Sequence, residues 1–497
     1  MGTVRSLLPL VAVTIPGVTA LLIVATRRWV NLRDSILFGG AAVTFAVVAS
    51  LLPTVLAGGV PTVSLGELIP GFELSLAADG MGLLFALLAS LLWVLASAYA
   101  IGYMRGGREG NQTRFYVFYA LCLSTAFGVA FAGDLFTFFV FYELLTASTY
   151  PLVTHKGNDA AIAAGRRYLG FLLSGGVLVL LGLVIVVATT GEVTFAAGGF
   201  VGDTLGPGLT VVTFLLFAIG FGTKAGLMPL HAWLPAAMVA PTPVSALLHA
   251  VAVVKAGVFA FGRLIGFVFG PDVLSGAFVT TLLAVVAGTT IVVASVIALR
   301  QDHLKRRLAY STIAHLAYIV LGFALLSRHA IEGALLHIVN HGFLKITLFF
   351  CAGAIYVHTS FDRVSQLDGI GRRMPFTMTA FAVASLGLAG LPPLGGFASK
   401  ATLVLGAWEA DAHVFAALMV GSGLLTAAYL FPIVHRAFFR PSRESAEAVA
   451  TSVDASPLMV VPLSITAAVA LLLGLGDLFG IQELAAGVAG AITGGAG

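Results

Sequence analysis

The chain has 497 residues, of which 59% are hydrophobic and only 10% charged, whereas soluble domains carry roughly 25% charged residues. This composition excludes a soluble globular protein and is typical of a membrane protein with many crossings. The formal net charge of +4 does not indicate a nucleic-acid partner, because most basic residues lie in short loops where membrane topology accounts for them.

Apolar runs of about 20 residues, the length that a helix needs to cross the hydrocarbon, recur along the chain. The first run, Leu7 to Ala25, is followed by Arg27 and lacks a small-residue cleavage site, so we interpret it as a membrane helix and not as a signal peptide. Hydropathy predicts an all-α polytopic fold with about 14 transmembrane helices. Their predicted centres lie near Ile15, Val43, Leu91, Cys122, Tyr142, Val177, Ile219, Val254, Ala287, Ile319, Asn340, Leu391, Gly423 and Ala468.

Lysine and arginine are concentrated in alternate loops. One set of loops holds Arg27, Arg28, Arg33, Arg105, Arg108, Arg114, Lys156, Arg166, Arg167, Arg300, Lys305, Arg306, Arg307, Arg363, Arg372, Arg373, Arg436, Arg440 and Arg443. The other set holds only Arg5, Arg263 and Arg328. Because basic loops stay in the cytoplasm, we expect a multi-pass protein of the cytoplasmic (inner) cell membrane with both termini outside the cytoplasm.

The predicted helices divide into four segments. Residues 1–111 hold three N-terminal helices, and residues 441–497 hold a polar linker and the last helix. Between them, residues 112–270 and 271–440 form two units of about five helices each, and an odd number of crossings makes such units inverted relative to one another.

Each unit contains one helix that proline interrupts. The interruption lies at Pro229 and Pro235 in the first unit and at Pro392 and Pro393 in the second. Proline removes a backbone donor, which is tolerated at membrane depth where protein or water satisfies the freed carbonyls. Breaks at matching positions favour an ion path through both units, and simple packing kinks are the alternative.

Charged residues lie inside several predicted helices. Glu143 is near the middle of the fifth helix with no basic residue in the same span, and Lys224, in the same unit, is its natural partner. Since burial opposes charge on both groups and pairing favours it, making or breaking the pair could switch their affinity for protons. A static structural ion pair is the alternative.

Histidines and lysines mark two further helices. His249 and Lys255 lie in the eighth helix, and His337, His341 and Lys345 lie in the eleventh. The last three are spaced i, i+4, i+8, which puts them on one helix face over roughly 12 Å. Imidazoles titrate near neutral pH, so this ladder could pass protons with the help of water.

The remaining titratable candidates are less regular. Lys400 follows the second helix break, whereas Lys224 precedes the first. His231, beside the first break, and His315, in the tenth helix, are possible relay groups that could equally be structural. Read together, the charges predict proton movement along the middle of the bilayer, with access gated by the broken helices.

No cofactor or metal site is predicted. Cys122 and Cys351 stand alone in predicted helices, without the spacing of a metal or iron–sulfur ligand set. The sequence also lacks an Asp, Asn and Thr cage that would clearly coordinate sodium.

Five stretches resemble the antiporter-like subunits shared by respiratory complex I, membrane-bound hydrogenases and Mrp-type cation/proton antiporters. They are FYELLTASTYPLV around Glu143, PLHAWLPAAMVAPTPVSALLHAVAVVKAG through Lys255, RRLAYSTIAHLAYIVLG from Arg306, HIVNHGFLKITLFFCAGAIY from His337 and GLPPLGGFASK through Lys400. One departure is Ala236, where many relatives have an acidic residue, so the role of that acid does not carry over.

The resemblance implies roles for the titratable residues. Glu143 and Lys224 correspond to a coupling ion pair, Lys255 to a connecting lysine, and Lys400 to a terminal lysine. His337, His341 and Lys345 correspond to a central polar relay. A lysine at position 400, together with the chain length, resembles the D-type component of Mrp antiporters more than the central component of complex I.

We therefore expect a proton-translocating subunit of a multisubunit Na⁺/H⁺ antiporter, with other hydrophobic subunits as partners and protons and sodium as transported ions. No enzyme chemistry is implied. A proton-pumping subunit of complex I or of a related hydrogenase is the alternative in the same class. Two alternatives belong to other classes. One is a membrane scaffold whose buried charges only fix the register of the helices, and the other is a stand-alone solute carrier.

Overall fold

The computed structural model describes residues 2–202, 204–441 and 454–494. Arg443 and most of the predicted polar linker lie outside these residues. Within them, 13 helical segments are long and apolar enough to cross a membrane. The prediction of an all-α polytopic membrane protein is thus confirmed.

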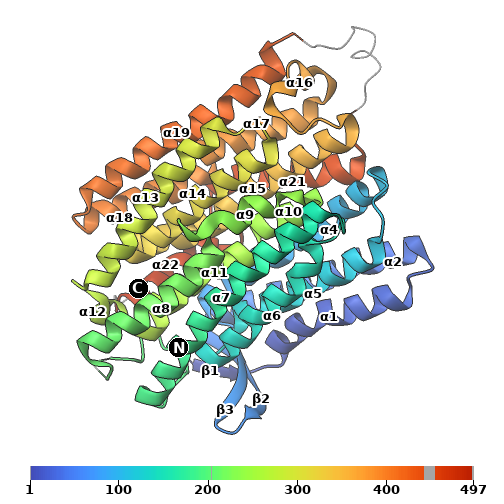
Figure 1. The fold of residues 1–497 in the computed structure, drawn as a ribbon. Coiled ribbons are helices and arrows are strands. Elements are labelled where there is room, and N and C mark those ends of the chain that lie inside the picture. Colours follow the sequence, from blue (N-terminus) through green and yellow to red (C-terminus); the bar gives the residue numbers. More distant parts are fainter. Residues whose placement is uncertain (1, 203, 442–453, 495–497) are drawn as a thin grey trace.

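The first part of the chain forms a bundle of long helices (Figure 1). Their bounds are α1 Leu8–Ala25, α2 Val30–Ser50, α3 Leu52–Leu56, α4 Gly80–Gly106, α5 Gln112–Phe131, α6 Leu135–Val153, α7 Asp159–Thr190 and α8 Gly206–Ala225. Short helical pieces follow, namely η1 Leu230–Ala232, α9 Trp233–Ala236, η2 Ala237–Val239, α10 Thr242–Ala250, α11 Val253–Arg263, η3 Leu264–Phe269 and α12 Pro271–Leu274.

Long helices return in the second part. Their bounds are α13 Phe278–Arg300, α14 Leu304–Ala324, α15 Arg328–Thr359, η4 Val364–Gln366, α16 Ile370–Arg373, α17 Pro375–Ala389, α18 Gly395–Glu409, α19 His413–Phe439, α21 Pro457–Leu475, η5 Leu478–Gly480 and α22 Ile481–Ile492. The predicted centre at Leu391 falls between α17 and α18, which have 15 residues each. Each is too short to span alone, so they form the two halves of a broken crossing.

Three features were not predicted from the sequence. A three-stranded sheet joins β1 Gly2–Arg5, β2 Gly59–Ile69 and β3 Phe72–Ala77, with β1 parallel and β3 antiparallel to β2. The eighth predicted helix is broken between α10 and α11, where two successive backbone amides donate to the same carbonyl of Leu247. The Gly/Ala-rich tail contains α22.

The two ends of the bundle differ. In Figure 1, β1 and α22 lie on one side, whereas the α1–α2 turn and α16, which carry Arg27, Arg28, Arg372 and Arg373, lie on the other. Hydrogen bonds link other basic loops at this arginine-rich end: Arg114 donates to the carbonyl of His155, at 2.8 Å. These basic loops therefore lie together at one end of the bundle. Both ends of the chain lie at the other, as an even number of crossings requires.

The core consists of the broken α10–α11 segment together with α14 and α15, which are almost entirely buried. They are surrounded by helices such as α1, α2, α7 and α19, whose outer faces are exposed. Since the central helices carry most of the intramembrane histidines and lysines, these polar groups lie inside protein and away from the surrounding lipid.

Arg263 corrects one sequence expectation, because it lies buried at the end of α11 and not in a loop. Its guanidinium binds the carboxylate of Asp79 through two nitrogens, and Asp79 also accepts a hydrogen bond from the amide of Gly82, at 2.7 Å. The carboxylate thus caps α4 and fixes that helix to α11.

We expect Asp79→Asn to lower the melting temperature of the purified protein. The amide can still cap α4 but leaves the buried Arg263 charge without a carboxylate, which costs on the order of 3 kcal/mol. Glu67→Gln, which changes an exposed carboxylate in the sheet, is the control. Equal melting of the two variants would show that the pair does not support the fold.

Candidate functional site

The first group of intramembrane charges is an ion pair between α6 and α8. Nζ of Lys224 lies 3.7 Å from Oε1 of Glu143 and donates to the carbonyl of Tyr142. It also lies 3.2 Å from the centre of the Tyr142 ring, in cation–π contact. The lysine side chain is 1% exposed and the glutamate side chain 23%, so only the glutamate reaches the surface of this chain.

A glycine of α7 makes room for the glutamate. A Cβ at Gly176 would lie 2.6 Å from Cδ of Glu143, closer than real side chains approach. Any larger residue at this position would therefore push the carboxylate away from its present place. Gly176 therefore helps to determine the position of the Glu143 carboxylate, although glycine has no side chain.

The second group lies between α11, α14 and α15. Nζ of Lys255 is 2.8 Å from Nδ1 of His341. The ring of His341 stacks on that of His315, and Nδ1 of His315 is 3.1 Å from Nε2 of His337. Nδ1 of His337 in turn lies 2.9 Å from Oγ of Ser399. These contacts bring one lysine, three histidines and a serine together from four helices.

Lys345 completes the α15 ladder. Its ammonium donates to Oγ of Ser311 at 2.7 Å and to the carbonyl of Leu308 at 3.2 Å, both on α14. The hydroxyl of Ser311 also lies 2.8 Å from that of Tyr429 on α19. All three members of the i, i+4, i+8 set thus face α14, as their spacing requires.

Lys400 lies at the end of the second group. Its ammonium donates to the carbonyls of Leu388, at 2.8 Å, and Ala389, at 3.4 Å, in the last turn of α17. It also lies 5.1 Å from the centre of the Tyr318 ring. The carbonyl end of a helix attracts cations, so the broken helix itself provides a site for this ammonium.

The two helix breaks have the same local design. Gly226 directly follows α8 and Gly390 directly follows α17, both with left-handed backbone (φ +70° and +93°) that favours glycine. In each case the next residue, Leu227 or Leu391, donates its amide to the carbonyl five residues earlier. The sequences GLMP and GLPP then place proline three residues after the glycine, at Pro229 and Pro393. Pro392 lies in the second break, whereas Pro235 lies inside the short helix α9 that follows the first.

Some predicted residues are not joined to either group. Among the described residues, no hydrogen bond or ion pair connects Lys224 to Lys255, although the backbones of α8 and α11 touch beside Gly257. His249 is buried against the Phe349 ring, and neither of its ring nitrogens has a hydrogen-bond partner in the described part of the chain. His231 instead borders a cavity of about 450 Å³ that Arg167 and Arg306 also line.

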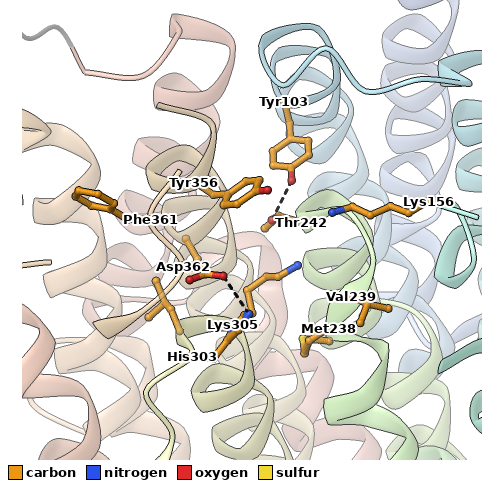
Figure 2. Close-up of a pocket in the computed structure, with 12 residues that line it drawn as sticks. Tyr103, Lys156, Met238, Val239, Thr242, His303, Lys305, Tyr356, Phe361 and Asp362 are labelled. Atoms are coloured by element: carbon orange, nitrogen blue, oxygen red, sulfur yellow. Dashed lines mark hydrogen bonds and ion pairs between the residues drawn. The ribbon is translucent and has the colours of Figure 1, made fainter. Parts of the chain in front are cut away.

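A second cavity, of about 150 Å³, lies at the arginine-rich end (Figure 2). Figure 2 shows the side chains of Lys156 and Lys305 directed into the same space, with His303 and Asp362 opposite. Lys305 donates to the carbonyl of Ala240 at 2.8 Å, and His303 lies 3.8 Å from Asp362. Burial lowers the pKa of His303, and the carboxylate of Asp362 opposes this shift.

The polar residues that connect the titratable ones were not predicted from the sequence. Ser311 and Tyr318 lie four residues before and three residues after His315, so all three share one face of α14. This spacing could have predicted, from the sequence alone, that Ser311 and Tyr318 lie beside His315. Ser399 precedes Lys400 directly, but its contact with His337 depends on how α18 packs against α15 and has no local signature. In the described residues, no group of three or more His, Cys, Asp or Glu side chains could hold a metal ion.

Known proteins resemble this chain over most of its length. The N component of NADH-quinone oxidoreductase from Desulforudis audaxviator is 35% identical, over 87% of this chain and 87% of that protein. The D component of the Na(+)/H(+) antiporter from Alkalihalophilus pseudofirmus is 30% identical, over 84% of this chain and 85% of that protein. A chain of the Mrp complex from Dietzia sp. has the same fold, with a TM-score of 0.86, 23% identity and coverage of 98% and 97%.

The family model described as NADH:quinone oxidoreductase/Mrp antiporter, transmembrane, matches residues 132–426. These residues include both proline-containing breaks and the intramembrane charges and histidines from Glu143 to Lys400. They make up more than half of the chain, which confirms the resemblance seen in the sequence motifs. The chain therefore belongs to the NADH:quinone oxidoreductase/Mrp antiporter family of transmembrane subunits.

Proposed function

We propose that this chain is the proton-carrying, D-type component of a multisubunit Na⁺/H⁺ antiporter. The observation that carries the proposal is the buried series of polar contacts from Lys255 through His341, His315 and His337 to Ser399. His341 and His315 stack without a hydrogen bond, so transfer between them requires water or a turn of the rings, and Lys400 adjoins the series through the Tyr318 ring. The similarity of the chain to the antiporter D component of A. pseudofirmus supports the same assignment.

The chemistry of the series suits protons. Imidazole donates through one nitrogen and accepts through the other, so bonded histidines can pass a proton without moving their backbones. Lys255, Lys345 and Lys400 have no carboxylate within ion-pair distance among the described residues. Charge on one of these amines therefore disfavours charge on the next, which couples their protonation along the series.

The Glu143–Lys224 pair is proposed as the switch of the first unit. At 3.7 Å the ammonium and the carboxylate are in loose contact. A small shift of either side chain therefore changes the electrostatic potential at Lys255 on the adjoining helix. Proton transfer between Lys224 and Lys255 requires water or a rearrangement at the breaks beside them. We place the gate there, between residue 226 and residue 252.

The wider arrangement completes the proposal. Residues 112–270 and 271–440 are taken as the two inverted units, each with one GL-x-P break. The arginine-rich end faces the cytoplasm, so both termini lie on the opposite side. Partner subunits in the cytoplasmic membrane form the sodium route.

Membership of a complex I-type oxidoreductase is the second candidate. The specific observation in its favour is the 35% identity to the N component of NADH-quinone oxidoreductase, against 30% to the D component of the antiporter. In that case the same residues would carry protons, but a redox reaction in partner subunits would drive them.

We expect Glu143→Gln, Lys224→Met and Lys400→Ala each to reduce sodium-driven proton exchange by about tenfold or more, since each removes a charge whose loss raises a transfer barrier by more than about 1.4 kcal/mol. Proton flux is measured in everted vesicles that contain the whole complex, at matched assembly. Arg5→Gln, an exposed change in β1, is the control. Full exchange in Lys224→Met would return this lysine to a scaffold role.

We expect Gly176→Ala to reduce exchange, up to roughly a hundredfold, because a displacement of about 1 Å in a reacting group can have that effect. Gly170→Ala lies on the same helix, where a Cβ meets nothing within 4 Å, and should leave exchange unchanged. The same vesicle assay compares them. Equal activity of the two variants would mean that the position of Glu143 does not matter.

Co-purification separates the two candidates. If the chain belongs to an antiporter, the complex isolated from its native membrane contains hydrophobic subunits only, and its proton flux follows the sodium gradient. Iron–sulfur proteins in the isolated complex, with flux that follows quinone reduction, would instead establish the oxidoreductase. Mass spectrometry of the complex and flux measured with and without sodium give the answer.

A further inference from the structure

A groove of about 750 Å³ lies between α2, α4 and α21, on the surface of the helix bundle. Its walls are apolar and include large side chains that are exposed in this chain, namely Phe38 (43%), Leu458 (43%), Val461 (53%) and Ile465 (41%). The volume is within the range of small-molecule sites. Gly39 also lines it, and a Cβ there would meet nothing within 4 Å.

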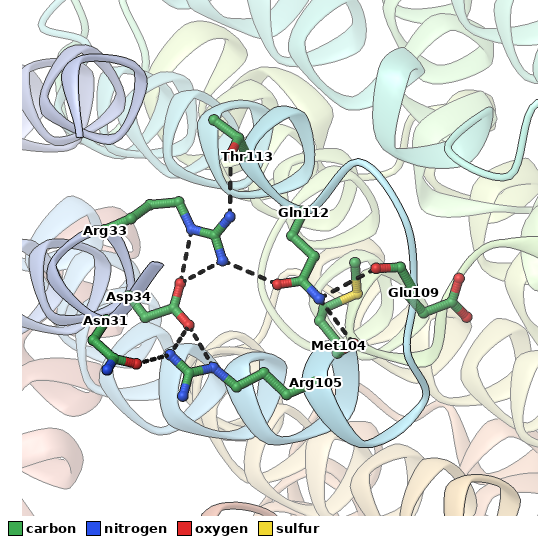
Figure 3. Close-up of polar contacts among 8 residues, drawn as sticks. All are labelled: Asn31, Arg33, Asp34, Met104, Arg105, Glu109, Gln112 and Thr113. Carbon is green, nitrogen blue, oxygen red and sulfur yellow. Dashed lines mark hydrogen bonds and ion pairs between the residues drawn. The ribbon is translucent and has the colours of Figure 1, made fainter. Parts of the chain in front are cut away.

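One end of the groove is charged (Figure 3). Figure 3 shows the guanidinium groups of Arg33 and Arg105 on either side of the Asp34 carboxylate. Arg33 lies 2.8 Å from one carboxylate oxygen and Arg105 2.5 Å from the other. Arg105 also donates to the side-chain carbonyl of Asn31, at 3.0 Å. Two arginines share one aspartate here, so the end of the groove has a net positive charge.

The two arginines differ in exposure. The Arg33 side chain is 5% exposed and also binds Gln112 and Thr113, which fixes it inside the protein. The Arg105 side chain is 40% exposed, and its Nη1 donates no hydrogen bond within the described part of the chain. Arg33 thus holds Asp34 in place, while Arg105 presents donors at the mouth of the groove.

The groove is as deep as one leaflet of a membrane. From Arg105 to Val94 along α4, its wall extends for about 16 Å at roughly 1.5 Å per residue. Half of the hydrocarbon core is about 15 Å thick. α21 runs antiparallel alongside, with Leu458 in its first turn packed against Gly102 near the charged end. From these lengths we place the charged mouth at headgroup depth and the far end of the apolar wall near the midplane.

We propose that this groove binds an anionic phospholipid, with one acyl chain along α4 and α21 and its phosphate on Arg105. The free Nη1 of Arg105 can donate charge-assisted hydrogen bonds to a phosphate oxygen while Nε and Nη2 stay on Asp34 and Asn31. The net positive charge at the mouth favours a headgroup with a net negative charge over a zwitterionic one. The inference rests only on the membrane location of the chain and is independent of the transport role proposed above.

Photocrosslinking tests the proposal. Membranes that contain the whole complex are supplied with phosphatidylglycerol that carries a photoreactive group on one acyl chain, and labelled peptides are mapped by mass spectrometry. We expect labelling at residues 94–101 and 458–465 at least severalfold above that of the exposed apolar residues Val420 and Leu424 on α19. Gly39→Phe fills the groove and should abolish this excess.

Gly421→Phe is the matched control, because a Cβ at Gly421 on α19 also meets nothing within 4 Å. It should leave the groove labelling unchanged. Arg105→Gln keeps Asp34 paired with Arg33 and should remove the preference for phosphatidylglycerol over phosphatidylcholine. Labelling no stronger than on α19, labelling insensitive to Gly39→Phe, or crosslinks from these peptides to a partner subunit in place of lipid would each overturn the proposal.

Discussion

Backbone hydrogen bonding inside the membrane is the constraint on which this structure depends. Hydrocarbon offers no partner to a free carbonyl, so each helix break must be satisfied by the protein. At both breaks a left-handed glycine turns the chain and the following amide bonds back into the last turn. The ammonium of Lys400 then binds two further carbonyls of α17. The break and the buried lysine stabilise each other, since one supplies acceptors and the other a cation.

The lysines beside the two breaks differ in sequence position and in their partners. Lys224 precedes its break by two residues, whereas Lys400 follows its own by ten, yet each is placed at the last turn of a half-helix. Lys224 belongs to that turn, and Lys400 reaches it from the next helix. The two ammonium groups nevertheless have different partners. That of Lys224 binds the carbonyl of Tyr142 on α6 and pairs with Glu143, whereas that of Lys400 binds two carbonyls of α17 and has no carboxylate partner among the described residues.

Hydropathy and proline spacing were sufficient to predict the long helices, the breaks at Pro229 and Pro393, and the closeness of Glu143 to Lys224. The break between α10 and α11 escaped prediction because no proline or glycine marks it. The pairing of β1 with β2 escaped because it is non-local, whereas the β2–β3 hairpin had a local signal, the Pro70–Gly71 turn, that was overlooked. His315 looked ambiguous alone, and only packing of α14 on α15 brings its ring against two others. The local sequence pattern predicts individual helices, whereas the packing of one helix against another determines which polar residues come into contact.

The hydrogen bonds of His337 have a consequence for repeated turnover. Its Nε2 faces His315 and its Nδ1 faces Ser399, so in the neutral ring one nitrogen donates and the other accepts. In the proposed path, a proton that passes along this row would exchange the donor and the acceptor at every link and leave the row with the opposite polarity. The rings and the hydroxyl must turn back before a second proton can follow in the same direction. In a core this closely packed, the rate of that reorientation sets an upper bound on throughput.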